Sequence, residues 1–392
     1  MWIVFDTNKN EIMAYESVDK LQKTLAETVF NHTKDPKKAA GRALGTLVEI
    51  ITYYLLKTWG LNNQISIERG LEEYGNEEIS HNVEYSLHPI IRNFVFSVVK
   101  TDLALTSTKI LKALAETNFD LSGFDKKSNS LLDKDGILRN ACTIATSESS
   151  FLLCSIKSDK GDMLELNIYE QSRKPYAMFE CKRVGVEEGM TKGPQTIEKA
   201  KQGAYVARVA SSLQKIRTET GEMYGIIYKS DGSYVIKPFV ELMENIIFSE
   251  DSELLRRFIL TVGIVSNHGN WFTAENQNKE LKVLAQSYDW LIFLTDKGLS
   301  EFIEKLLFKP IPELRFLKDT FLASYVEGKR KNQFTKVQMN IEADRLLLAY
   351  FSENLAEIEN WFNIISPKSK TLDHLKSELK ALSMKTWTTI LR

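Results

Sequence analysis

Apolar residues first recur at helical spacing in KDPKKAAGRALGTLVEIITYYLLKTWGL, residues 34–61. Asp35 followed by Pro36 is a favourable N-cap and first-turn pair, and Gly60 stands where a helix C-cap would fall. The pattern therefore predicts a helix between Pro36 and Gly60. Glu49 lies beside its apolar stripe.

Short apolar runs bounded by turn residues predict strands further along the chain. We expect strands or extended segments at 64–68, 82–87, 137–155, 162–169, 176–182, 223–228 and 233–238. Helices are expected at 91–116, after Pro194, and through nearly all of the chain from about 250. This order predicts a mixed α/β (α+β) fold with a boundary near 245, between a catalytic domain (1–245) and a helical domain (246–392) for DNA recognition or dimerisation.

Composition restricts the class of protein without identifying it. The 392 residues include 51 Lys and Arg, 52 Asp and Glu, and three scattered cysteines, with no C-x-x-C spacing. Near-neutral charge argues against a purely electrostatic nucleic-acid binder, but it does not exclude an enzyme with a basic cleft. No signal peptide is expected, and the longest apolar run, 258–265, is too short for a membrane span. We expect a soluble cytoplasmic protein with neither a disulfide framework nor a zinc knuckle.

The stretch YAMFECK, residues 176–182, ends an apolar strand with an acid and a base. Residues i and i+2 of a strand point to the same face, so Glu180 and Lys182 should project side by side. The pattern Glu-x-Lys occurs four times in the chain, and only this copy ends an apolar strand. The alternative is a strand end that carries its charges into solvent.

A second acid is expected across a hairpin. If 162–169 and 176–182 pair about a turn near 171–172, Asp162 lies opposite Glu180 or Lys182, while Glu165 points to the other face. A slip of one residue would reverse this assignment. Two adjacent carboxylates suit Mg²⁺ or Mn²⁺, and a nearby ammonium can orient or deprotonate a metal-bound water. This arrangement is suited to in-line attack on a phosphodiester.

With these residues, the chain resembles the PD-(D/E)XK nuclease superfamily, which includes most type II restriction endonucleases. The resemblance covers roughly residues 41–211: a helix with Glu49, a strand with Asp162, the Glu180–Lys182 motif, and a following helix. It implies a restriction-endonuclease-like core, a central mixed sheet flanked by helices. It also implies that Asp162, Glu180 and the Cys181 carbonyl hold Mg²⁺, that Lys182 positions the water, and that Glu49 supports the metal.

Other residues have both a functional and an ordinary interpretation. Gln202 and Tyr205 resemble a glutamine–tyrosine element of some family branches, with a spacing one residue short, but Gln202 also suits a solvated helix position. Lys192, before a helix N-terminus, suits either a DNA-contacting loop or an ordinary surface loop. Glu49 also fits the boundary of an amphipathic helix. The basic stretch 327–333 is either solvated or in contact with a phosphate backbone.

The resemblance implies an Mg²⁺-dependent, sequence-specific endonuclease acting on double-stranded DNA, a type II restriction enzyme. Such an enzyme would belong to a restriction-modification system with a cognate DNA methyltransferase, and a homodimer is compatible with it, although no residue pattern marks an interface. The alternatives are a modification-dependent or repair nuclease of the same fold and a non-catalytic DNA-binding protein. The motifs of serine hydrolases, histidine metal sites and P-loop ATPases are absent from the sequence.

Overall fold

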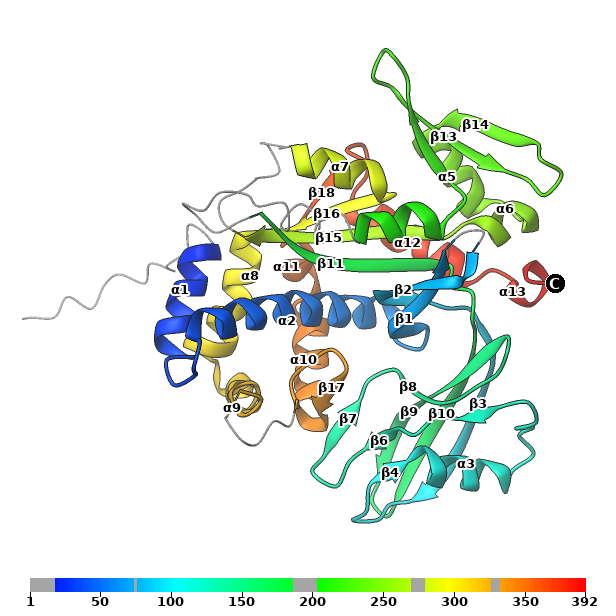
Figure 1. Ribbon diagram of the computed structural model, residues 1–392. Coiled ribbons are helices and arrows are strands. Elements are labelled where there is room, and N and C mark those ends of the chain that lie inside the picture. The colour runs from blue at the N-terminus through cyan, green and yellow to red at the C-terminus, as the bar shows by residue number, and fades with distance from the viewer. Residues whose placement is uncertain (1–17, 74–75, 186–202, 269–278, 326–331) are drawn as a thin grey trace, which may run out of the picture.

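A six-stranded mixed sheet forms the centre of the computed structural model, which describes residues 18–73, 76–185, 203–268, 279–325 and 332–392 (Figure 1). Its strands, in spatial order, are β1 (Ile65–Glu73), β2 (Asn76–Leu87), β11 (Ala177–Gly185), β15 (Leu260–His268), β16 (Trp290–Leu294) and β18 (Phe362–Ser366). The three inner strands β11, β15 and β16 run parallel, and every other neighbouring pair is antiparallel.

Helices cover both faces of this sheet. On one face lies α2 (Pro36–Leu56), whose N-cap Asp35 accepts a hydrogen bond from the Lys38 amide, so the predicted helix is confirmed. The hydrophobic core that contains the buried side chains of α2 also includes residues of α5 (Phe239–Phe248), α8 (Asp296–Ile303), α10 (Ile341–Glu353) and α12 (Leu372–Ser383). The helical residues 203–210 and α7 (Lys279–Ser287) pack on the other face. Burial from both sides explains why β16 is apolar throughout, and β15 is buried along almost its whole length.

Residues 90–172 form a second sheet between β2 and β11 in the chain. Its order is β3 (Ile90–Val99), β10 (Met163–Ser172), β9 (Ser150–Lys160), β8 (Cys142–Thr146) and β5 (Asp125–Lys126), and α3 (Ser107–Ala115) packs on its separate core. A small sheet joins it to the C-terminal part of the chain through β17 (Gln338–Asn340), β7 (Ile137–Arg139), β6 (Ser130–Leu132) and β4 (Leu105–Thr106).

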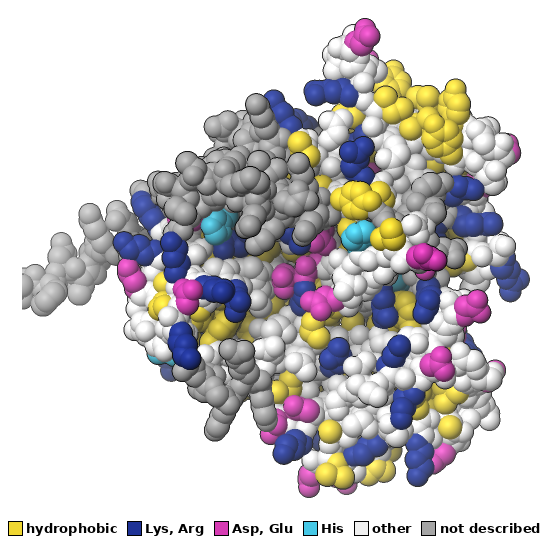
Figure 2. All heavy atoms as spheres, in the orientation of Figure 1, with side chains coloured by type: hydrophobic (Ala, Val, Ile, Leu, Met, Phe, Trp, Pro, Cys, Tyr) yellow, Lys and Arg dark blue, Asp and Glu magenta, His cyan; other side chains and the backbone are white. Residues whose placement is uncertain are grey.

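A third module packs on α5. It consists of β12 (Gln214–Arg217), β13 (Met223–Tyr228) and β14 (Tyr234–Pro238), and its outer face exposes the apolar patch in the upper right of Figure 2, which includes Ile216, Tyr228, Tyr234 and Ile236. The remaining helices are α1 (Val18–Thr28), α6 (Ser252–Arg257), α9 (Arg315–Ala323), α11 (Leu355–Glu359) and α13 (Trp387–Ile390). None of the helices in the described ranges has both the length and the apolar character of a membrane span.

The predicted hairpin of 162–169 with 176–182 is wrong. Both segments are strands, but β10 pairs with β9 and β3 in the second sheet, whereas β11 pairs with β2 and β15 in the central sheet. The tight turn lies at Gly161, whose φ of 70° is the left-handed conformation that glycine favours. Asp162 therefore belongs to the turn between β9 and β10.

Two further expectations are corrected. The helix expected at 91–116 is β3 followed by the short α3, because Phe94, Phe96 and Val98 alternate inward in a strand pattern. The region after 250 contains β15, β16 and β18 of the central sheet. A boundary near 245 therefore does not separate two units, because strands from both sides of it pair directly.

Candidate active site

The central sheet opens into a fork between β2 and β11. The two strands pair only from Ala177–Leu87 to Phe179–Tyr85, and beyond this point β11 continues beside β15 alone. At the opening, the Glu84 backbone amide donates a hydrogen bond of 3.1 Å to Oε2 of Glu180. The Glu180 carboxylate thus binds a backbone N–H that strand pairing leaves free.

Glu180 is also paired with the lysine two residues later. Its Oε1 lies 2.6 Å from Lys182 Nζ, as expected for neighbours on one face of a strand. The Glu180 side chain is only 7% exposed, and that of Lys182 is 36% exposed. Burial raises the pKa of Glu180, and the Lys182 ammonium opposes this effect. The strand therefore presents a buried carboxylate and a more accessible ammonium at the fork.

Three further carboxylates surround a lysine from the C-terminal part of the chain. Lys336 Nζ lies 3.4 Å from Glu49 Oε2 and 3.2 Å from Glu68 Oε1, and it forms an ion pair with Glu84. The side chains of Lys336 and Glu84 are 8% and 11% exposed. Burial raises the pKa of Glu49, and Lys336 is the largest influence that lowers it. We call Glu49, Glu68, Glu84, Glu180, Lys182 and Lys336 the fork cluster.

The backbone around the fork cluster fixes its members. Tyr85 donates its hydroxyl to the Glu49 carbonyl, which joins β2 to α2. Glu68 has a left-handed backbone with φ of 51°, a strained conformation for a non-glycine residue and one often found at functional sites. Figure 2 shows acidic side chains gathered near the middle of the face that it presents.

A glycine gives the Glu180 side chain its space. A Cβ at Gly203, in the helical residues 203–210, would lie 2.7 Å from Glu180 Cγ and 2.6 Å from the Tyr288 hydroxyl. Gly263 on β15 leaves similar room for the Tyr288 ring. Close approach of the helix to Glu180 therefore requires glycine at 203.

The structure brings some of the predicted site residues together and separates others. Glu49, Glu180 and Lys182 belong to the fork cluster. The Cys181 side chain points toward α2, where its Sγ lies 3.4 Å from Thr52 Oγ1, and its pKa is raised by burial. Lys192 and Gln202 lie outside the described residues. Tyr205 is half exposed, with its ring against His81.

Asp162 is not part of the fork cluster, so its expected meeting with Glu180 is wrong. Strand β10 rises about 3.3 Å per residue over ten residues, which separates Asp162 from the end leading to β11 by roughly 30 Å. Glu165 is also elsewhere, paired with Lys157 and Lys160. The residue of the neighbouring strand β2 that contacts the Glu180 carboxylate is Glu84, through its backbone amide.

Sequence reasoning missed three members of the fork cluster: Glu68, Glu84 and Lys336. Glu68 and Glu84 lie in segments that were predicted as strands, but Glu84 takes an ordinary polar position in the polar–apolar alternation NVEYSL, which is a weak signal. Lys336 gave none, because its place depends on contacts with residues more than 250 positions away.

The donor chemistry of the fork cluster fits a hard divalent cation, but its arrangement centres on an ammonium. Carboxylate oxygens are the ligands that Mg²⁺ prefers. In the described part of the chain, however, no three acidic, histidine or cysteine side chains have the arrangement of a metal site. Lys336 supplies the positive charge between Glu49, Glu68 and Glu84.

Comparison with known proteins adds no assignment: no family model, curated protein or solved structure matches this chain.

Proposed function

We propose that this protein is an Mg²⁺-dependent endonuclease that hydrolyses phosphodiester bonds of double-stranded DNA at specific sequences, as a type II restriction enzyme does. The observation that carries the proposal is the buried Glu180 carboxylate beside Lys182 at the fork, where the backbone of Glu84 contacts it. The order helix, two strands, the Glu180–Lys182 strand, helix and parallel strand also supports a restriction-endonuclease-like core.

In this proposal Glu84 takes the role that the resemblance gave to Asp162. It is an acid longer by one methylene, on the strand that pairs with the first residues of β11. Glu84, Glu180 and the Cys181 carbonyl would hold Mg²⁺, which supplies positive charge to the phosphodiester oxygens. Binding there would require the Lys336 ammonium to leave Glu84, because both cations would use that carboxylate.

Lys182 would orient the attacking water, and its neutral amine form would take the proton of that water. It is the more exposed partner of its ion pair, so water and substrate reach its ammonium. Glu180 holds this ammonium at 2.6 Å and fixes its direction. Glu49, from the other face of the sheet, adds negative charge at the fork and would support a metal indirectly.

The first test is cleavage of unmodified supercoiled plasmid with and without Mg²⁺. We expect discrete bands only with Mg²⁺, and we expect Lys182→Ala to lower the rate by about 10²–10⁴-fold because a proton-transfer group is lost. Lys157→Ala, at an exposed position on β9, is the matched control and should cut normally.

Three outcomes would contradict this proposal. Normal cutting by Lys182→Ala removes the role given to that lysine. Cleavage restricted to methylated plasmid indicates a modification-dependent nuclease, and DNA binding without any cleavage indicates a non-catalytic DNA-binding protein.

A further inference from the structure

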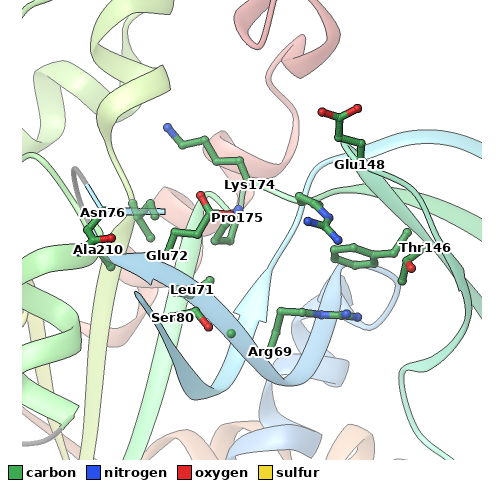
Figure 3. Close-up of a pocket in the computed structure, with 14 residues that line it drawn as sticks. Arg69, Leu71, Glu72, Asn76, Ser80, Thr146, Glu148, Lys174, Pro175 and Ala210 are labelled. Carbon is green, nitrogen blue, oxygen red and sulfur yellow. The ribbon is translucent and has the colours of Figure 1, made fainter. Parts of the chain in front are cut away.

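A pocket of about 850 Å³ lies between the β1–β2 hairpin and the second sheet. Arg69, which follows Glu68 of the fork cluster, lines it from β1. Arg173 and Lys174 line it from the connection between β10 and β11. Figure 3 shows Arg69 and Lys174 on opposite sides of the pocket, with Thr146 and Glu148 at the side formed by β8 and β9.

Burial and neighbouring positive charges lower the pKa values of two cations in this pocket. Burial lowers the pKa of Lys174 to about 8, with a further contribution from Arg256 and Arg257. Burial also lowers the pKa of Arg69 to about 10, with a further contribution from Arg173. No carboxylate in the described ranges offsets either effect. Two acids, Glu72 and Glu148, do line the pocket.

Arg69 is held in a fixed position with one donor unused. Its guanidinium carbon lies 3.9 Å from the centre of the Phe151 ring, and its Nη2 donates to Thr143 Oγ1 at 2.8 Å. Its Nε is buried and has no hydrogen-bond partner among the described residues. A buried donor of this kind is costly unless a ligand accepts from it. The pocket is thus lined by an ordered cation.

We propose that Arg69, Arg173 and Lys174 bind one backbone phosphate of the DNA whose cleaved phosphodiester lies at the fork cluster. A phosphate brings negative charge and several acceptor oxygens, which match guanidinium donors and an ammonium. Lys174 precedes Glu180 by six residues, which is at most roughly 20 Å of extended polypeptide. The same length along the axis of a DNA duplex covers about six phosphates of one DNA strand, at roughly 3.4 Å each. One duplex can therefore reach both places.

This inference rests on the proposed function for its substrate, and its test is independent of cleavage. The variant is Arg173→Gln/Lys174→Gln in the full chain, and the measurement is binding of a labelled 30-base-pair duplex in EDTA across a range of NaCl. Lys112→Gln/Arg217→Gln removes the same charge from exposed positions on α3 and β12 and serves as the control. Thermal unfolding checks that each variant is folded, and the exposed Arg173→Gln alone replaces the double variant if it is not.

We expect the pocket variant to bind about tenfold more weakly at low salt, with the slope of log K against log salt reduced by about one, as for one lost phosphate contact. The control should keep the wild-type slope. Equal binding and equal slopes in pocket variant and wild type overturn the inference. So does loss of binding to inorganic phosphate without any effect on the duplex, which indicates a small-anion pocket.

The failures of the two proposals are distinguishable. If wild type cuts DNA in Mg²⁺ while the pocket variant binds duplex normally, the pocket inference fails and the nuclease proposal stands. If wild type never cuts but duplex binding still depends on Arg173 and Lys174, the nuclease proposal fails and the pocket inference stands.

Discussion

At the residue scale, two groups stabilise the buried Glu180 carboxylate, a backbone amide and an ammonium. It accepts from the Glu84 amide and pairs with Lys182, yet its pKa remains raised because the loss of water outweighs both contacts. The local part of this arrangement was predictable from sequence, since the pleat of one strand brings Glu180 and Lys182 together. The position of Glu84 depends on which strand lies beside β11, and local patterning does not determine that.

Glu180→Gln should therefore make the protein more stable at pH 8. The folded-state pKa of Glu180 lies above its ordinary value of 4.5, so the protonated form is favoured in the fold, and stability is lost as pH rises through that raised value. Glutamine keeps an oxygen for the Glu84 amide without the buried charge. Thermal unfolding from pH 4 to 8 checks this: the advantage of the variant should appear at high pH and shrink toward pH 4. A variant that is less stable than wild type at pH 8 would contradict it.

At the scale of elements, a short segment around Lys336 holds the fork cluster and the second sheet together. Asn140 donates to the Lys336 carbonyl at 3.0 Å, and β17 pairs with β7 directly after it. The side chain of the same lysine reaches Glu49, Glu68 and Glu84. Removing it leaves the nearly buried Glu84 carboxylate without its counter-charge, which is much more costly than losing a surface ion pair.

Lys336→Met is expected to lower the free energy of unfolding by about 3 kcal/mol at pH 8. The loss should be smaller at pH 5, because the Glu49 carboxyl, whose pKa burial raises, takes up a proton as pH falls. Millimolar Mg²⁺ should raise the Tm of this variant more than that of wild type, since ion and ammonium compete for Glu84. Urea unfolding at both pH values and thermal unfolding with Mg²⁺ measure these effects.

The control for that experiment is Lys297→Met, because Lys297 is 77% exposed and pairs only with Glu301 within the described residues of α8. It should change stability by less than about 1 kcal/mol. Equal stability of Lys336→Met and wild type at pH 8 would mean that the ammonium does not balance the carboxylates.

At the scale of the whole molecule, residues 90–172 separate β2 from β11 in sequence while the two strands stay neighbours in the sheet. This insertion explains why the sequence placed Asp162 beside Glu180: Asp162 is close to Glu180 along the chain, and Glu84, whose amide contacts Glu180, is 96 positions away. A stronger turn signal was present at Gly161, and it would have paired 150–160 with 163–172. The helix 36–56 was predictable because its cap and apolar stripe are local. The central sheet was not, because it joins distant strands.

Cleavage by two matched variants, Glu84→Gln and Asp162→Asn, tests the central claim most directly. Each removes one carboxylate charge with little change in size, and Asp162 lies in an exposed turn of the second sheet. With Mg²⁺ and supercoiled plasmid, we predict that Glu84→Gln loses cleavage by at least about 10²-fold, while Asp162→Asn cuts at the wild-type rate. Loss of cleavage in Asp162→Asn together with normal cutting by Glu84→Gln would contradict the account.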